Sequence, residues 1–184
     1  GVHLYEHGVI SFCNQLAKDC GVEIGMTVKE AAYLLLTVDT NVLIPSETTN
    51  RTIMHTSPDG RHIIATDSIA FGTNADTDTN VLVTAGHTGR SAVPYLLECR
   101  PWGFICSDGG MGMDDSGTIG LGMVEEFGLA GATVDAKLAR MGNGLSHYYD
   151  GIISAVNRHA KGKGVEIGMP ASEAALLLLE KKTL

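Results

Sequence analysis

Short runs of Val, Ile and Ala, each bounded by glycine or a polar residue, fill the middle of the chain. They read RHIIATDSIAF, TNVLVTAGH, WGFICSDGG and GATVDAKLA. Runs of this length and composition are typical of β-strands, and runs that are apolar throughout are typical of strands buried on both faces. Two segments with a helical pattern, GRSAVPYLLECR and DSGTIGLGMVEEFG, separate the last three runs. This alternation predicts a Rossmann-like βαβ centre with a parallel sheet over about 61–143.

Two stretches near the ends of the chain have closely similar sequences. Residues 8–36 align with residues 151–179 at an offset of 143, and 18 of the 29 aligned pairs are identical. In each copy an amphipathic stretch, GVISFCNQLAKD or GIISAVNRHAKG, precedes the loop GVEIGM and a second apolar stretch. Thr27 and Glu30 fit a capping box at the start of that second stretch, and Pro170 suits the first turn of its counterpart. Each copy therefore predicts an αα-hairpin.

Together these patterns predict a single α/β domain over 1–184. We expect a three-layer α/β/α arrangement with a mostly parallel sheet and a βαβαβ centre. The two repeated αα-hairpins, 8–36 and 151–179, would flank that centre and cover part of the sheet. Residues 37–61 are less clear, because NVLIP and RTIMHTSPDGRH could form strands or a hairpin around the SPDG turn at 57–60.

Charge and composition narrow the class of partner. The formal net charge is −8 with only 13 Lys and Arg, and these are scattered, whereas a protein that binds phosphate backbones needs a clustered basic surface. No run reaches the roughly 18 apolar residues of a membrane span, and the start lacks a signal-peptide pattern. The four cysteines form no CxxC pair. We expect a cytoplasmic protein with free thiols that binds neither nucleic acid nor membrane.

Ligands of open parallel sheets bind outside the carboxyl ends of the strands, so the loops after the predicted strands form the candidate site. The loop GHTGRS at 86–91 is the most informative. Its glycines permit a tight turn into a helix whose first N–H groups, with the Arg90 guanidinium, would bind an anion. His87 is a candidate proton-transfer group; alternatively it bonds to backbone and a hydroxyl caps the helix. The candidate substrate-binding residues of this loop are Gly86, Thr88, Gly89, Arg90 and Ser91.

The other loops contribute mainly carboxylates. Asp67 and Asp108 each follow a predicted strand and are further catalytic candidates. Asp114 and Asp115 form, with Asp108, a candidate site for a divalent cation such as Mg²⁺, or a base with an orienting partner. Alternatively, Asp115 or Ser116 caps the next helix. The last loop adds two candidate substrate-binding residues, Arg140 and Asn143.

Two nucleophiles compete with this interpretation. The stretch TDSIAFG resembles the GDS block of SGNH esterases, with Thr66 in place of the first glycine, and the resemblance implies a nucleophile in that block. That family also has an aspartate three residues before a late histidine, where this chain has Gly144 before His147. Cys106 is either a thiolate nucleophile at a strand end or a side chain packed in the sheet.

Three hypotheses for function remain. The leading one is an enzyme that acts on a small carboxylate or phosphate by hydrolysis, elimination or isomerisation, with His87 moving a proton. The second is a non-catalytic module that binds a nucleotide or metabolite at the same loop. The third is an assembly protein, because AAYLLL and AALLLL are apolar on more than one helix face and predict a homo-oligomer.

Overall fold

The computed structural model describes residues 1–37 and 51–180. The sequence predicts one domain over 1–184, whereas the contacts divide the chain into two compact units, Gly1–Glu47 and Thr48–Leu184. Each unit is therefore described by itself. The stretch NVLIP lies outside the described residues.

Within residues 1–37, the first unit has three short helices and a small core. The helices are α1 (Val2–His7), α2 (Gln15–Asp19) and α3 (Val28–Leu36). Thr27 and Glu30 form the predicted capping box at the start of α3. Cys13, Val22 and Ala31 make the buried core of this unit, with Ile10, Ala17 and Leu34 packed against it.

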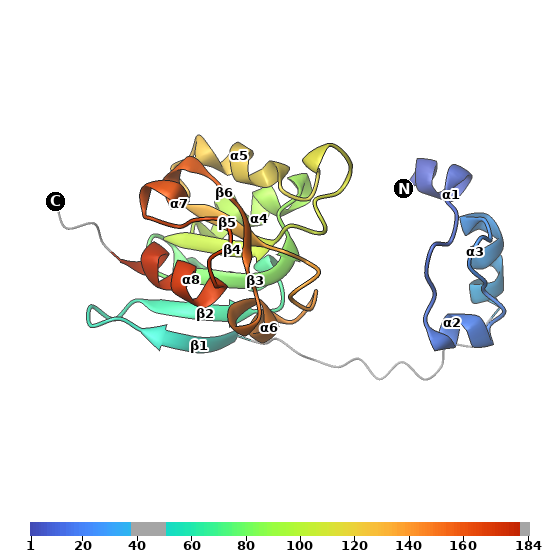
Figure 1. Cartoon of the computed structure of the whole chain (residues 1–184), viewed down its shortest axis with the longest axis horizontal. Helices are drawn as coiled ribbons and strands as arrows, with labels where there is room; N and C mark the ends of the chain where they lie inside the picture. The colour runs from blue at the N-terminus through green and yellow to red at the C-terminus, as the bar shows by residue number, and fades with distance from the viewer. Residues whose placement is uncertain (38–50, 181–184) are drawn as a thin grey trace. The chain divides into compact units, whose positions relative to one another are not determined.

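The second unit is built on a six-stranded sheet in the order β1-β2-β3-β4-β5-β6 (Figure 1). The pairs from β2 to β5 are parallel, and the pairs β1–β2 and β5–β6 are antiparallel. The strands are β1 (Arg51–Thr56), β2 (His62–Thr66), β3 (Val81–His87), β4 (Gly103–Ser107), β5 (Gly131–Val134) and β6 (Ile153–Val156). The predicted α/β class is confirmed, as a mixed sheet with helices.

The helices of this unit fall into two groups along the chain. Those between the parallel strands are η1 (Ile69–Phe71), η2 (Asn74–Asp76), η3 (Arg90–Ala92), α4 (Val93–Cys99), η4 (Met113–Asp115) and α5 (Ile119–Glu125). Those after β5 are α6 (Gly144–Tyr149), α7 (Arg158–Gly162) and α8 (Ala171–Leu179). Residues 51–66 form the hairpin that the SPDG turn suggests.

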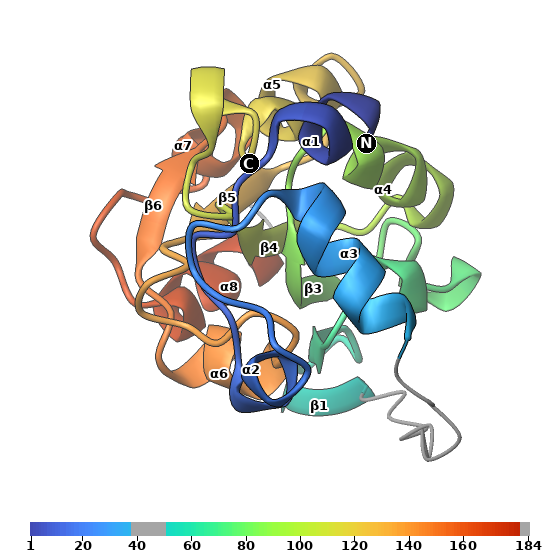
Figure 2. The same cartoon turned by 90° about the vertical axis from the view of Figure 1, so that its right-hand side faces the viewer.

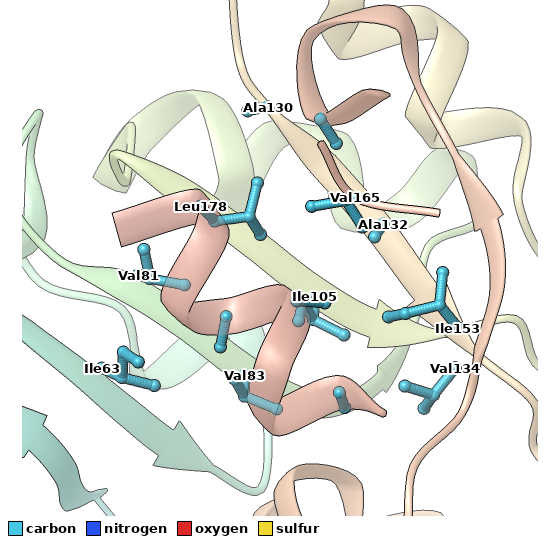
Figure 3. Close-up of a cluster of buried hydrophobic side chains, with 14 of the residues drawn as sticks. Ile63, Val81, Val83, Ile105, Ala130, Ala132, Val134, Ile153, Val165 and Leu178 are labelled. Atoms are coloured by element: carbon cyan, nitrogen blue, oxygen red, sulfur yellow. The ribbon is translucent and has the colours of Figure 1, made fainter. Parts of the chain in front are cut away.

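Each face of the sheet has its own hydrophobic cluster. Neighbouring residues alternate between the clusters: Val81 and Val83 pack with α8, whereas Leu82 packs with α4 and α5. Figure 3 shows Leu178 of α8 beside strand residues such as Val81 and Ile105, and Figure 2 shows the unit from a second direction. η1, α4 and α5 contribute buried residues to the cluster that contains Leu82. α7 and α8 contribute buried residues to the cluster that contains Val81.

The first predicted helix of each repeat is wrong in its first half. In the C-terminal copy, Ile153–Val156 is β6, which pairs with β5, and only Arg158–Gly162 is helical. In the N-terminal copy, helix begins at Gln15. The stretch GIISAV is short, apolar and β-branched, so periodicity alone could not separate a strand from a helix, and pairing with β5 decides the outcome.

Candidate functional site

The carboxyl ends of the four central strands meet at one edge of the sheet, because β2, β3, β4 and β5 are parallel. The loops that begin at Asp67, His87, Asp108 and Asp135 therefore meet there, as the sequence predicts. Hydrogen bonds tie them together. The Gly142 N–H donates to the Ala85 carbonyl at 3.1 Å, and the Thr88 N–H donates to the Ser107 carbonyl at 3.1 Å.

His87 ends β3 and is exposed at this edge. Its Nδ1 accepts a hydrogen bond from the Gly89 N–H at 2.9 Å. A ring nitrogen that accepts a hydrogen bond carries no proton, so the neutral imidazole holds its proton on Nε2. In this arrangement His87 is a hydrogen-bond donor through Nε2.

Glycines allow the loops to pass very close to His87. A Cβ on Gly89 would lie 2.8 Å from His87 Nδ1, and a Cβ on Gly109 would lie 3.1 Å from His87 Cβ. A Cβ on Gly117 would lie 1.9 Å from the Asp108 carbonyl oxygen, which no side chain tolerates. These glycines serve close backbone approach, and they bring the loop after β4 against the His87 side chain.

The loop between Asp108 and Gly117 has an unusual backbone. Three of its non-glycine residues have positive φ: Met111 at 66°, Asp114 at 55° and Asp115 at 53°. A left-handed conformation costs a non-glycine residue about 1–2 kcal/mol. The Gly117 N–H donates to the Met111 carbonyl at 2.7 Å and closes the loop. Such backbone strain is concentrated at functional sites in proteins.

Asp108 anchors this loop. Its side chain is buried, with 2% exposure of the residue, and Oδ1 accepts hydrogen bonds from the Gly110 N–H at 2.7 Å and the Ala136 N–H at 3.0 Å. A carboxylate in this position joins the loops after β4 and β5. The structure therefore gives Asp108 Oδ1 a positioning role.

Asp67 has a comparable role. Its Oδ1 accepts a hydrogen bond from the Gly144 N–H at 2.8 Å, which joins the loop after β2 to the start of α6. Arg140 and Asn143 lie together in a separate hollow of about 320 Å³. The Asn143 Oδ1 caps α6 by accepting from the Ser146 N–H. His87 is not among the residues that line this hollow.

The loop at 86–91 differs from its prediction in one respect. The Thr88 N–H is bonded to Ser107 and the Gly89 N–H to His87, so neither is free for an anion. Thr88 is fully buried, and its hydroxyl donates to the Ser107 carbonyl at 3.4 Å. Gly86 has open space where a Cβ would stand. Arg90 and Ser91 are exposed and remain available to a ligand.

Asp114 and Asp115 are exposed on the strained loop. Within residues 1–37 and 51–180, no group of three or more His, Cys, Asp or Glu side chains is placed to hold a metal ion. The described side chains thus give no support to the predicted cation site. Neither aspartate caps α5, whose N-cap residue is Thr118.

His147 is a residue that the sequence did not assign to the site. It is fully buried on α6, and its Nδ1 lies 3.1 Å from the Asn143 carbonyl oxygen. Its Nε2 has no hydrogen-bond partner among the described residues. Burial lowers the pKa of His147, although the Asn143 and Arg140 carbonyls and the Asp108 charge oppose this. A neutral imidazole therefore lies beneath the carboxyl edge.

The two alternative nucleophiles have structural contacts. The Ser68 hydroxyl accepts from the Ala70 N–H and caps η1. Cys106 is fully buried, its Sγ accepts a hydrogen bond from the Thr84 hydroxyl, and burial raises the pKa of its thiol. Burial likewise raises the pKa of Cys99 to about 11. These two thiols stay protonated at neutral pH.

A second hollow, of about 370 Å³, lies near the amino ends of β4 and β5. Cationic side chains gather there in an acidic protein: Arg100, Arg158 and Lys163 are among the residues that line it. Two cations lie over the Trp102 ring, with Lys163 Nζ 4.6 Å and Arg61 Cζ 5.0 Å from its centroid. Its Nε1 is buried and lacks a partner among the described residues.

Comparison with known proteins adds no function. Neither a protein-family model, nor a curated protein, nor a solved structure matches the chain. Over the part of the chain that the structure describes, the helices are too short or too polar to cross a membrane.

Proposed function

We propose that the second unit binds a small carboxylate or phosphate at the carboxyl edge of its sheet and acts on it by hydrolysis, elimination or isomerisation. The observation that carries this proposal is the Gly89–His87 hydrogen bond, which leaves Nε2–H as the donor of an exposed imidazole. A neutral histidine that donates from Nε2 can polarise a substrate carbonyl or stabilise a developing oxyanion.

Arg90 supplies the positive charge of the proposed site. It is exposed, three residues after His87 in the same loop, and a guanidinium binds carboxylate or phosphate with two parallel hydrogen bonds. Asp67 and Asp108 hold the surrounding loops in place through backbone N–H groups. In this proposal His87 and Arg90 contact the substrate, and the carboxylates position them.

The setting that suits this activity is a reducing cytoplasm. The four cysteines of the chain are all unpaired, and such thiols are typical of that compartment. Homo-oligomerisation, which the apolar helices suggest, remains a separate proposal.

A ligand screen by thermal unfolding tests the proposal. Trp102 is the one tryptophan of the chain, so its fluorescence follows the second unit. Inorganic phosphate, acetate and small dicarboxylates are added to the wild type, Arg90→Ala, His87→Ala and His87→Gln. A ligand at 100 times its Kd raises the free energy of unfolding by about 2.7 kcal/mol. We expect this stabilisation to be lost in Arg90→Ala and His87→Ala and retained in part by His87→Gln, which keeps an N–H donor.

Arg158→Ala is the matched control, because it removes a guanidinium near the opposite end of the strands. It should leave the ligand effect unchanged. An effect that survives Arg90→Ala and His87→Ala would contradict the proposed site. Hydrolysis of p-nitrophenyl phosphate and p-nitrophenyl acetate is then measured with the same variants.

The hollow near Arg100 favours a second candidate function, non-catalytic binding of a small anion. Arg100, Arg158 and Lys163 line it, and guanidinium and ammonium groups donate hydrogen bonds to anions. Arg158 also pairs with Glu125, and Lys163 Nζ donates to the Leu178 and Glu180 carbonyls, so an anion would compete with these groups. The same screen separates the two candidates. Stabilisation lost in Arg158→Ala and Arg100→Ala but kept in Arg90→Ala would assign binding to this hollow.

A further inference from the structure

The first unit and the end of the second unit share one backbone geometry. We call residues 144–179 the closing segment and Gly1–Leu36 the N-terminal segment. Equivalent antiparallel bridges join Val9 to Thr27 and Ile152 to Pro170. Equivalent hydrogen bonds, all of 2.8 Å, run from Ile10 N to Met26 O, Gly25 N to Ile10 O, Ile153 N to Met169 O and Gly168 N to Ile153 O. The repeat is therefore structural, and it extends to α1, the counterpart of α6.

The surroundings of the two segments differ completely. In the closing segment, Ile153–Val156 pairs with β5 and α8 packs on the sheet. The corresponding residues 10–13 form no strand within the described chain. Leu179 of α8 is 3% exposed, whereas its counterpart Leu36 is 80% exposed. The N-terminal segment thus has the shape of a sheet-covering element without the sheet.

The positions that are buried in the closing segment are nonetheless nearly all shared by the two copies. Residues 151–179 contain ten buried residues, and nine of these have an identical counterpart in residues 8–36. The exception is Ala171, which is Val28 in the other copy. Of the remaining 19 positions only nine are identical. Two of the nine identical counterparts of buried residues, Val22 and Ala31, are buried in the core of the first unit itself. The other seven are buried only in the closing segment, so the N-terminal segment retains residues that its own core does not bury.

The paired residues Asn157 and Asn14 also share a side chain whose hydrogen bonds to a sheet are, in the described chain, seen only in the closing segment. Asn157 binds backbone outside the repeat: Oδ1 accepts from the Gly131 N–H at 3.1 Å, and Nδ2 donates to the Leu129 carbonyl at 2.8 Å. Its counterpart Asn14 caps α2 through the Ala17 N–H, as Asn157 caps α7, but Asn14 is exposed. Capping uses only the oxygen of Asn14. The side-chain amide of Asn14 could bind the backbone at the start of a β5-type strand, as the amide of Asn157 binds Gly131 and Leu129.

We propose that Gly1–Leu36 is the closing segment of another domain of the same fold. Its partner is a sheet of the β1–β5 type, of the kind that residues 51–143 form, which carries no closing segment of its own. Residues 10–13 add the antiparallel edge strand, Asn14 binds the backbone at the start of the β5-type strand, and Leu35 and Leu36 pack on the open face. The sheet of the second unit is excluded as partner, because β6 and α8 already cover it.

A segment exchange within the full chain tests the proposal. Residues 151–179 are given the sequence of residues 8–36, which requires eleven substitutions. They are Ile152→Val, Ala155→Phe, Val156→Cys, Arg158→Gln, His159→Leu, Gly162→Asp, Lys163→Cys, Pro170→Thr, Ala171→Val, Ser172→Lys and Leu176→Tyr. If the N-terminal segment fits such a sheet, the variant keeps one cooperative thermal transition of Trp102 fluorescence, with Tm lowered by no more than about 10 °C.

A second variant covers the one buried difference. It retains Ala171 and carries the other ten substitutions, because the larger valine side chain could overpack this fully buried position. Loss of the cooperative transition in both variants would overturn the proposal. Adding Asn157→Ala to the exchanged chain should lower Tm by about as much as it does in the parent chain. No decrease in the exchanged chain would also overturn it, since the segment would then not bind the edge as β6 does.

Light scattering on the unmodified chain and on Leu35→Asp tests the alternative occupant, a second copy of the chain. We expect the two masses to be equal, because every copy of the chain fills its own sheet edge. A wild-type oligomer that becomes monomeric in Leu35→Asp would overturn the proposal and assign the exposed face to self-association.

Discussion

The N-terminal segment and the closing segment are nearly the same sequence in two different environments. The closing segment buries Leu178 completely, and the N-terminal segment leaves its counterpart Leu35 45% exposed. Both nevertheless keep the same loop, asparagine cap and bridge. The local geometry is thus set by short-range interactions, such as the Asn caps and the glycines of positive φ. The sheet adds stability and strand pairing to an element that is already shaped.

The comparison separates the stability that comes from burial against the sheet from the stability that comes from local caps and bridges. Fully burying a leucine side chain stabilises a protein by about 1.5–3 kcal/mol, and that contribution exists only where the sheet is present. Caps and bridges contribute about 1 kcal/mol each in either environment. Substitutions at paired positions can therefore measure the sheet's contribution directly.

The largest difference is expected at the paired leucines. Leu178→Ala removes a fully buried side chain and should lower the free energy of unfolding of the second unit by about 3 kcal/mol. Leu35→Ala, its matched control, should leave the Trp102 transition in urea unchanged, because Leu35 belongs to the other unit. Equal effects of the two substitutions on that transition would refute the comparison.

The paired asparagines should differ by somewhat less. Asn157→Ala leaves the buried Gly131 N–H and Leu129 carbonyl without their partner and removes a helix cap, so we expect a loss of about 2–3 kcal/mol in urea denaturation. Asn14→Ala removes only a cap and should leave the Trp102 transition where it is. A small effect of Asn157→Ala would mean that water replaces its hydrogen bonds.

His147 should make the stability of the second unit depend on pH. Its counterpart in the first unit is Leu4, which does not titrate. Burial lowers the pKa of His147 from its ordinary value of 6.5. The unfolded chain then binds a proton that the folded chain does not, so stability is full above about pH 6.5 and decreases as the pH falls below it. His147→Leu should reduce this decrease while changing stability at pH 8 by about 1 kcal/mol. Urea denaturation at pH 8 and pH 5.5 measures both; an unchanged pH dependence would argue against a buried neutral imidazole.

The smallest effect is expected where the two segments are alike. Gly25 and Gly168 have φ of 96° and 91°, and no atom lies within 4 Å of a Cβ placed on either. Alanine at each should therefore cost only the backbone penalty, about 1 kcal/mol. Gly168→Ala should lower the free energy of unfolding that the Trp102 transition reports by this amount. Gly25→Ala should speed amide exchange in α3 and leave the Trp102 transition unchanged. Unequal costs would show that the sheet alters the loop itself.

The position of the candidate loops was predictable from the sequence, but the hydrogen bonds of their side chains were not. Counting strands and loops located the carboxyl edge, because parallel strands bring the loops after His87 and Asp108 to one side. The hydrogen-bond partners of Asp108 could not be read from the chain. Its carboxylate binds the Ala136 N–H, a group 28 residues away in sequence, and His147 is buried only because α6 packs on the sheet.

The sequence by itself determined the elements whose signals are local. Buried strands such as NVLVTA, the capping box at Thr27 and the duplicated loop GVEIGM follow from side chains within a few residues of one another. Tertiary structure alone decided whether the first half of each repeat is a strand. In the closing segment, Ile153–Val156 pairs with β5 and becomes β6; in the N-terminal segment the identical Ile10 and Ser11 have no strand beside them within the described residues. A strand needs hydrogen-bond partners from elsewhere in a protein, and the sequence of the strand itself does not supply them.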